Sequence, residues 1–335
     1  MSTVIKIAIP MAGYGSRMRP LTWTKAKPLI SVAGRTVLDY LLEQFSTLPD
    51  SIEREFIFIV SSFQLDQIKA YMKENHPDLK VDYVVQEQMT GQSDAIYTAG
   101  DKLSGPLITA FSDTLIEPDL TNLFNDPING VIWVKEVDDP SRFGVVSVKD
   151  KLVAKLVEKP TEFVSNLAVV GFYYFKEGED LLKAIEEQKY RKLTQKNEYF
   201  LADAINIWLE GGRQMRAETV DVWLDAGIPE ALLDTNRYLL RKHFSNNPPT
   251  SDDYLVVPPV YVHPTAKINA SVIGPYVSIG KNCVIDRACI QDSILEEKIS
   301  LSNTILTKSL LGKEIRIEGR PETLNLGDNA KVSRT

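Results

Sequence analysis

Short, β-branched apolar runs alternate with amphipathic stretches through the first third of this chain, and this alternation restricts the fold more than any other feature. The runs are typical of buried parallel strands, and helical spacing separates them. We predict strands at residues 4–10, 55–61, 81–85 and 106–111, and helices at 37–45, 64–75 and 94–102. Strands that alternate with helices indicate an α/β fold, with a Rossmann-like, mostly parallel sheet and helices on both of its faces.

Further apolar runs lie closer together along the chain. They predict strands at 130–135, 144–148 and 170–175, with helices at 179–187, 200–210 and 230–243. Because fewer helices separate these strands, we expect part of the sheet to be antiparallel, which makes the sheet mixed.

The length of 335 residues exceeds a comfortable single core and favours two domains. A polar, proline-containing stretch at 245–253 has the composition of a linker. We therefore predict a main domain at 1–243, a linker at 244–258 and a C-terminal domain at 259–335.

Aliphatic residues recur at intervals of six in the C-terminal part. They are Ile273, Ile279 and Ile285, then Ile299, Ile305, Leu311 and Ile317. A period of six with one aliphatic per unit indicates a hexapeptide β-helix, in which stacked coils bury the aliphatic column. Such a coil leaves open faces that a second chain can cover, so we expect a homo-oligomer, a dimer or higher.

The charge and the N-terminus limit where the protein acts. A formal net charge of −7 argues against a nucleic-acid or membrane-surface binder. The N-terminus lacks the pattern of a signal peptide, and no apolar stretch approaches the ~20 residues of a membrane span, so we expect a cytoplasmic protein. Cys283 and Cys289 are too few for a disulfide scaffold and are interpreted as small buried side chains.

A glycine-rich turn follows the first predicted strand. Gly13 and Gly15 let the backbone approach a ligand, and consecutive N–H groups in such a turn bind anions. Arg17 follows the turn, where its guanidinium can meet phosphate oxygens. Met18 stands where the dinucleotide fingerprint needs a third glycine, which weakens an NAD-dependent oxidoreductase interpretation.

Carboxylates follow two later strands. Asp113 follows the strand predicted at 106–111, and Asp225 follows an aromatic-bearing apolar strand. Ligands bind at the carboxyl ends of parallel strands, and carboxylates there can hold Mg²⁺ beside phosphates. Each aspartate, taken alone, could equally cap a turn. Glu158 and Lys159, held by Pro160, could contact a sugar hydroxyl and a phosphate, or form a solvated charge pair.

In this order and spacing, these segments resemble the sugar nucleotidyltransferase family, also called nucleotide-sugar pyrophosphorylases, over residues 4–240. With the C-terminal repeat, the whole chain resembles the long-form glucose-1-phosphate thymidylyltransferases, whose catalytic domain precedes a short left-handed β-helix. The resemblance implies an enzyme of class EC 2.7.7 that needs Mg²⁺. Its substrates would be a nucleoside triphosphate and a sugar 1-phosphate, and its products a nucleotide sugar and pyrophosphate.

The resemblance also implies roles for particular residues. The implied catalytic residues are Arg17, Lys27 and Lys159, and the metal ligands are Asp113 and Asp225. The implied nucleotide-binding residues are Gly13, Gly15, Ser16, Gln86 and Gly91, and the sugar-binding residues are Gly144, Glu158, Gly171 and Glu198.

The sequence indicates the identity of the substrates less directly than it indicates the reaction. Gln86 carries a donor and an acceptor, which suits the paired edge of thymine or uracil, so dTTP is favoured, then UTP, with glucose 1-phosphate. Ala12 and Ser112 depart from the family pattern beside the nucleotide, so a GDP-mannose or CDP-sugar pyrophosphorylase stays open. A non-catalytic regulatory homologue that binds nucleotide sugars is a further alternative. An acyltransferase built on the repeat would need a catalytic histidine, and His263 is poorly placed for that role.

Overall fold

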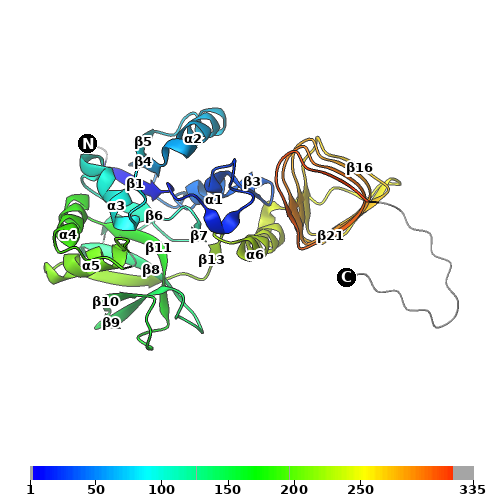
Figure 1. Cartoon of the computed structure of the whole chain (residues 1–335). Helices are drawn as coiled ribbons and strands as arrows, with labels where there is room; N and C mark the ends of the chain where they lie inside the picture. Colours follow the sequence, from blue (N-terminus) through cyan, green and yellow to red (C-terminus); the bar gives the residue numbers. More distant parts are fainter. Residues whose placement is uncertain (1–2, 126, 196, 320–335) are drawn as a thin grey trace. The chain divides into compact units, whose positions relative to one another are not determined.

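The computed structural model describes residues 3–125, 127–195 and 197–319 (Figure 1). The chain divides into two compact units. The first comprises Met1–Ile30 and Arg35–Thr235, and the second comprises Ser31–Gly34 and Asn236–Thr335. The predicted linker at 244–258 therefore falls within the second unit, and residues 320–335 of the predicted C-terminal domain lie outside the described residues.

A mixed sheet forms the centre of the first unit. Among the described residues, it has nine strands in the order β5 (Val81–Val85), β4 (Ile52–Val60), β1 (Thr3–Pro10), β6 (Leu107–Ala110), β11 (Leu167–Phe175), β8 (Gly130–Glu136), β12 (Met215–Thr219), β10 (Leu152–Glu158) and β9 (Gly144–Lys149). Strands β5 to β6 are parallel, as predicted. Beyond β6 the pairings are antiparallel, except that β8 and β12 are parallel. The mixed sheet is confirmed, but it is mostly parallel only on the β5 side.

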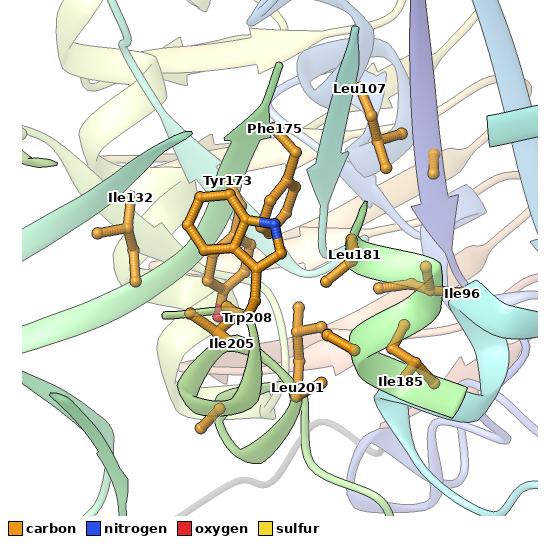
Figure 2. Close-up of a cluster of buried hydrophobic side chains, with 14 of the residues drawn as sticks. Ile96, Leu107, Ile132, Tyr173, Phe175, Leu181, Ile185, Leu201, Ile205 and Trp208 are labelled. Carbon is orange, nitrogen blue, oxygen red and sulfur yellow. The ribbon is translucent and has the colours of Figure 1, made fainter. Parts of the chain in front are cut away.

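Helices cover both faces of this sheet. Along β11, alternate side chains point to opposite faces, so Tyr173 and Phe175 contact a different layer from Phe172. Tyr173 and Phe175 join the buried cluster beneath α3 (Gln92–Thr98), α4 (Gly178–Tyr190) and α5 (Leu201–Glu210), shown in Figure 2. On the other face, Phe172 stacks at 5.6 Å on Phe45, which follows α1 (Val37–Glu43).

The predicted elements of the first unit are present, several with nearly the predicted bounds. The structure adds β10, β12 and the short strands β3 (Arg35–Thr36) and β7 (Thr114–Ile116), and β2 (Ser31–Val32) in the second unit. The short strand predicted before Asp225 is β13 (Trp223–Asp225). The remaining helices are α2 (Ser62–Asn75) and α6 (Pro229–Leu239), and a π-helical turn follows at Leu240–Phe244. In the part of the chain that the structure describes, no helix has the length and apolar character to cross a membrane.

The second unit is a stack of parallel strands (Figure 1). One sheet contains β14 (Tyr254–Val256), β17 (Ser271–Ile273), β19 (Val284–Gln291), β21 (Ser300–Thr307) and β23 (Arg316–Glu318), with β16 (Lys267–Asn269) also beside β19. The other contains β15 (Val260–Val262), β18 (Val277–Ile279), β20 (Ser293–Leu295) and β22 (Leu310–Leu311). Each strand pairs with one from the next coil, as Val260 does with Val277 and Val277 with Ser293. The left-handed sense of the coil stays a prediction.

Two side chains of this unit depart from the expected pattern. Ile273, Ile279, Ile285 and Ile299 are buried as predicted, but Ile305 is 83% exposed. Cys283 is buried, whereas Cys289, which pairs with Ile305 across β19 and β21, is exposed. Asn303 has a φ of 51°, so the chain turns inside β21 and changes which side chains point inward. The prediction that both cysteines and Ile305 are buried is therefore wrong.

Candidate active site

The glycine-rich turn leads from the end of β1 into a 3₁₀ turn at Ser16–Met18. Gly15 has a φ of +61°, and a Cβ there would lie 3.0 Å from Thr22 Cγ2 and 3.3 Å from Lys27 Cβ. The Thr22 hydroxyl donates a 2.8 Å hydrogen bond to the Gly15 carbonyl, and Met18 is fully buried. Glycine is therefore required at position 15, because both the conformation and the neighbouring atoms exclude a side chain.

Three charged side chains from separate segments meet just beyond this turn. The Lys27 ammonium donates to Asp113 Oδ2 over 2.6 Å, and an Arg17 guanidinium nitrogen lies 4.0 Å from the same oxygen. Lys27 is 12% exposed and Arg17 69% exposed. Lys27 thus forms the inner wall of the site, while Arg17 can reach a ligand from solvent.

The pairing of β7 with β13 brings the second aspartate to the same place. Asp225 lies opposite Thr114, the residue after Asp113, and the Ala226 N–H donates to the Asp113 carbonyl over 2.9 Å. Gly227 lies against both carboxylates: a Cβ there would be 2.7 Å from Asp225 Oδ1 and 3.2 Å from Asp113 Oδ2. A three-residue ladder therefore joins two acidic groups that are far apart in the sequence.

The two aspartates differ in their electrostatic surroundings. Burial alone would raise the pKa of Asp113, but the charge and hydrogen bond of Lys27 outweigh it and lower that pKa. The pKa of Asp225 is raised, first by burial and then by the charge of Asp113, against the opposing Gly227 N–H. The mutual repulsion of the carboxylates is a reason for a cation to bind beside them.

These carboxylates have the chemistry that Mg²⁺ requires. Hard divalent ions prefer oxygen ligands, and Mg²⁺ is typically held by one or two carboxylates together with substrate phosphates and water. Within residues 3–125, 127–195 and 197–319, no cluster of three or more His, Cys, Asp or Glu side chains is arranged to hold a metal. Asp113 and Asp225 thus fit a metal that shares its remaining positions with a ligand, rather than a closed structural site.

A cavity of about 440 Å³ opens beside these charges at the carboxyl ends of β1 and β6. Nine of the predicted site residues line it: Gly13, Gly15, Ser16, Arg17, Lys27, Gln86, Gly91, Asp113 and Glu198. Gly227, next to Asp225, lines it as well. The carboxyl ends of neighbouring parallel strands are where open α/β sheets bind ligands.

Gln86 and Gly91 are among the residues that line the cavity. Gln86 is buried, and its amide nitrogen donates to Asp94 over 3.4 Å. Gly91 has a φ of +121°, and a Cβ there would lie 2.5 Å from the Tyr199 backbone nitrogen. Glycine at position 91 therefore lets the segment around Tyr199 pack against the start of α3.

The remaining predicted residues form a second group outside the cavity lining. Glu158 pairs with Gly144 across β10 and β9, and the Lys159 ammonium lies 3.7 Å from Glu158. Burial raises the pKa of Glu158 more than Lys159 lowers it, and the charge of Asp203 adds to the rise.

Phe111 links the two groups, because it lines the cavity and its ring lies 6.0 Å from that of Tyr173. Burial raises the pKa of Tyr173, and the charge of Glu158 adds to that rise. Gly171 has a φ of +81°, and a Cβ there would lie 2.5 Å from Phe111.

Sequence reasoning did not assign roles to Phe111, Gly227 or Asp94. The sequence could have indicated Gly227 as a site residue, because it follows Asp225 in the Trp-x-Asp-x-Gly segment. No comparable signal marks Asp94, because its partners, Gln86 and Lys189, come from separate segments.

Comparisons with known proteins show the family to which the chain belongs. The family model described as "Nucleotidyl transferase" matches residues 8–242, and the model described as "GMPPB C-terminal domain" matches 256–334. The bifunctional protein GlmU of Methanocaldococcus jannaschii is 32% identical over 232 residues, which cover 69% of this chain and 53% of that protein. The chain thus spans about half the length of this and similar GlmU relatives.

Two further similarities extend the comparison. A glucose-1-phosphate thymidylyltransferase of Streptomyces griseus is 25% identical over 98% of this chain and 99% of its own length. The structure of a UDP-glucose pyrophosphorylase complexed with UDP-glucose superimposes with a TM-score of 0.62 over 72% of this chain and all of that chain, at 22% identity, which shows a shared fold. Because the first family model includes every segment that forms the site, this protein belongs to the nucleotidyl transferase family.

Proposed function

We propose that this protein transfers a nucleotidyl group from a nucleoside triphosphate to a sugar 1-phosphate, with release of pyrophosphate. The observation that carries the proposal is the meeting of Lys27, Asp113 and Asp225 beside a cavity that the glycine-rich turn also lines. Anion-binding backbone, cationic side chains and a pair of carboxylates are the groups that phosphoryl transfer requires.

The proposed reaction needs no protein nucleophile. A phosphate oxygen of the sugar 1-phosphate forms a bond to the α-phosphorus, and the bond from that phosphorus to the bridging oxygen of pyrophosphate breaks. The protein brings two anionic substrates together and offsets their repulsion. Lys27 and Arg17 would bind the triphosphate, while Gly13, Gly15 and Ser16 would surround it.

Asp113 and Asp225 would hold Mg²⁺, which would supply positive charge beside the phosphates. Lys27 already bonds one oxygen of Asp113 and keeps that carboxylate ionised and in place. Gly227 would leave room for the ion and the phosphates next to both carboxylates, since a side chain there would collide with each of them.

The sugar would bind toward the second group of residues. Glu158 has the burial and the acceptor atoms to bond a sugar hydroxyl, and Lys159 would bind the sugar phosphate. Lys159 has a φ of 45°, a backbone conformation that is uncommon outside glycine and recurs at functional sites. Gly144 and Gly171 would provide space for the sugar, and Glu198, which lines the cavity, would add an acid.

We favour dTTP and then UTP as the nucleotide, with glucose 1-phosphate as the acceptor. The similarity to a glucose-1-phosphate thymidylyltransferase over nearly the whole chain supports this order. Gln86 supports it as well, because its amide nitrogen bonds Asp94 and its oxygen is left to accept a hydrogen bond from the base.

The test is a pyrophosphate-release assay with Mg²⁺ and a panel of four nucleotides, dTTP, UTP, CTP and GTP, each with glucose 1-phosphate or mannose 1-phosphate. We expect Asp113→Asn and Asp225→Asn each to lose about 10²-fold or more in rate, because groups that stabilise developing charge carry such effects. The matched control is Asp221→Asn, at an exposed position before β13. Near-normal rates in both site variants would refute the metal assignment, and no pyrophosphate release with any pair would refute the function.

We also propose that the C-terminal coil is a left-handed β-helix through which chains associate. The exposed pair Cys289 and Ile305 presents an apolar strip on one sheet of that coil, which a second chain could cover. Size-exclusion chromatography with light scattering measures the mass of the protein in solution. A strict monomer at all concentrations would rule out association.

A further inference from the structure

The amide of Gln86 is held by a carboxylate behind the cavity. Gln86 follows β5 and is 4% exposed. Its Nε2 donates to Asp94 Oδ2 over 3.4 Å, and the Thr90 hydroxyl donates to the same oxygen over 2.6 Å. The other oxygen of Asp94 accepts a 2.5 Å hydrogen bond from the Lys189 ammonium. Each carboxylate oxygen of Asp94 therefore has its own partners.

Packing between helices fixes this arrangement. Asp94 lies on α3 and Lys189 on α4, and Ile96 and Ile185 of these helices belong to one buried cluster (Figure 2). The Lys189 ammonium also lies 4.7 Å from the centre of the Tyr97 ring, where a cation–π contact adds to the ion pair. The position of Lys189 relative to Asp94 thus depends on the hydrophobic core rather than on a mobile loop.

Asp94 can only accept hydrogen bonds. Burial opposes its ionisation, but the hydrogen bonds from Lys189, Thr90 and Gln86 outweigh burial and lower the pKa of Asp94. An ionised carboxylate has no proton to donate. The Gln86 side chain must therefore turn its nitrogen toward Asp94, and its oxygen is left to meet a base in the cavity.

We propose that Asp94, oriented by Lys189, fixes the amide of Gln86 so that the site selects bases with an N–H on their paired edge. Thymine and uracil carry N3–H, whereas cytosine has a lone pair on N3 that would face the Gln86 oxygen. A buried acceptor that meets another acceptor loses its hydrogen bond, and this penalty gives the selectivity. The inference rests on the proposed function in taking Gln86 as the contact to the base.

A single substitution should reverse the amide. In Asp94→Asn, Lys189 still needs an acceptor, so the asparagine oxygen takes the position of Oδ1 and its NH₂ takes that of Oδ2. That NH₂ would donate to Gln86, whose oxygen must turn toward it, so that Gln86 would present its own NH₂ to the base. The N3 lone pair of cytosine then gains a donor, and uracil N3–H loses its acceptor.

The experiment is titration calorimetry of UTP and CTP with the full-length protein, without sugar phosphate. The wild type should bind UTP about tenfold or more tightly than CTP, and Asp94→Asn should shift this ratio toward CTP by about 10–100-fold. Asp180→Asn is the matched control, because Asp180 on α4 also bonds a lysine and an arginine but is not among the residues that line the cavity. It should keep the wild-type ratio.

A double variant tests the role of Lys189 separately. In Asp94→Asn with Lys189→Met, nothing holds the asparagine oxygen away from Gln86, so the preference for UTP should return. An unchanged ratio in Asp94→Asn, or no return in the double variant, would overturn the proposal. If Asp94→Asn does not fold, the wild-type protein alone tests the proposal, because equal affinity of the wild type for UTP and CTP would overturn the proposal. Because binding is measured without turnover, a failure of the proposed reaction would be seen separately in pyrophosphate release.

Discussion

The Lys27 ammonium donates a 2.6 Å hydrogen bond to Asp113 Oδ2 across 86 positions of the sequence. Lys27 begins a 3₁₀ turn at Lys27–Leu29, and Asp113 follows β6. The pair is partly withdrawn from water, so its attraction is stronger than that of a surface pair. Lys27 therefore has two tasks: it holds one carboxylate of the proposed metal site, and it places a cation beside the cavity.

We expect Lys27→Met to lower the rate of pyrophosphate release by about 10²–10³-fold, because a fixed positive charge is lost where negative charge develops. Lys27→Arg should recover part of the loss, since the charge returns with a different shape. Lys102→Met is the control, because Lys102 forms an exposed pair with Asp82. Steady-state rates and thermal melting would be measured for all three variants. A rate within a few-fold of the wild type in folded Lys27→Met would contradict the assigned role.

The contact between Gly144 and Glu158 gives a test of the sugar side. A Cβ at Gly144 would lie 2.9 Å from Glu158 Oε2, so Gly144→Ala should move that carboxylate without changing any charge. We expect the KM for the sugar 1-phosphate to rise about tenfold, from the loss of one hydrogen bond to a charged group, while the KM for the nucleotide stays unchanged.

Gly211→Ala, at the exposed C-terminal end of α5, is the control for Gly144→Ala. If both KM values rose together in Gly144→Ala, the effect would come from general distortion rather than from the sugar contact.

Much of the first unit could be predicted because its strands have simple patterns. The parallel strands β1 and β4 are buried on both faces, so each appears as a nearly continuous apolar run. Strands β10 and β12 were missed because polar residues interrupt them, as Arg216 and Glu218 do in β12. A half-exposed strand of five residues is hard to distinguish from a loop.

The candidate site was predicted as a set of residues, but its geometry was not. The turn around Gly15 and the end of β6 lie beside each other in any open sheet that pairs β1 with β6. The approach of Asp225 to Asp113 depends instead on the register of β7 against β13, two strands of three residues each. Such short strands have no periodicity to detect, and their pairing depends on the tertiary fold.

The C-terminal coil was likewise predicted only in part. The period of six located the buried positions Ile273, Ile279, Ile285 and Ile299 correctly. In strand β21, the turn at Asn303 shifts the inward position by one residue, so that Leu306 packs against the buried cluster and Ile305 is exposed. A fixed period of six residues in the sequence does not account for a turn inside a strand.

A buried network at the start of α1 gives a prediction about stability. Asp39 and Thr36 form a capping box, in which each side chain bonds the other residue's backbone N–H. The hydroxyl of Tyr71 and the Nε2 of His76 also contact the Asp39 carboxylate, at 2.8 Å and 2.7 Å. Burial opposes ionisation, but the bonds from His76, Thr36 and Tyr71 outweigh it and lower the pKa of Asp39 below its ordinary 3.8.

A carboxyl group whose pKa is lower in the folded chain than in the unfolded chain stabilises the fold at pH values above its unfolded pKa. This contribution disappears as the pH falls through its folded pKa. We therefore expect Asp39→Asn to reduce the free energy of unfolding by about 1–3 kcal/mol at pH 7, because a charged cap and its bonds are lost. The difference from the wild type should shrink as the pH falls below about 4, where Asp39 becomes protonated in the unfolded chain and then in the folded one.

Hydrogen exchange of the α1 amides, read by mass spectrometry across this pH range, measures the local effect. The control is Asp66→Asn, at an exposed position on α2, which should match the wild type at every pH. A difference that persisted unchanged to pH 2 would show that the Asp39→Asn substitution acts through the shape of the new side chain rather than through the lost charge, and would contradict the assignment of Asp39 as an ionised cap.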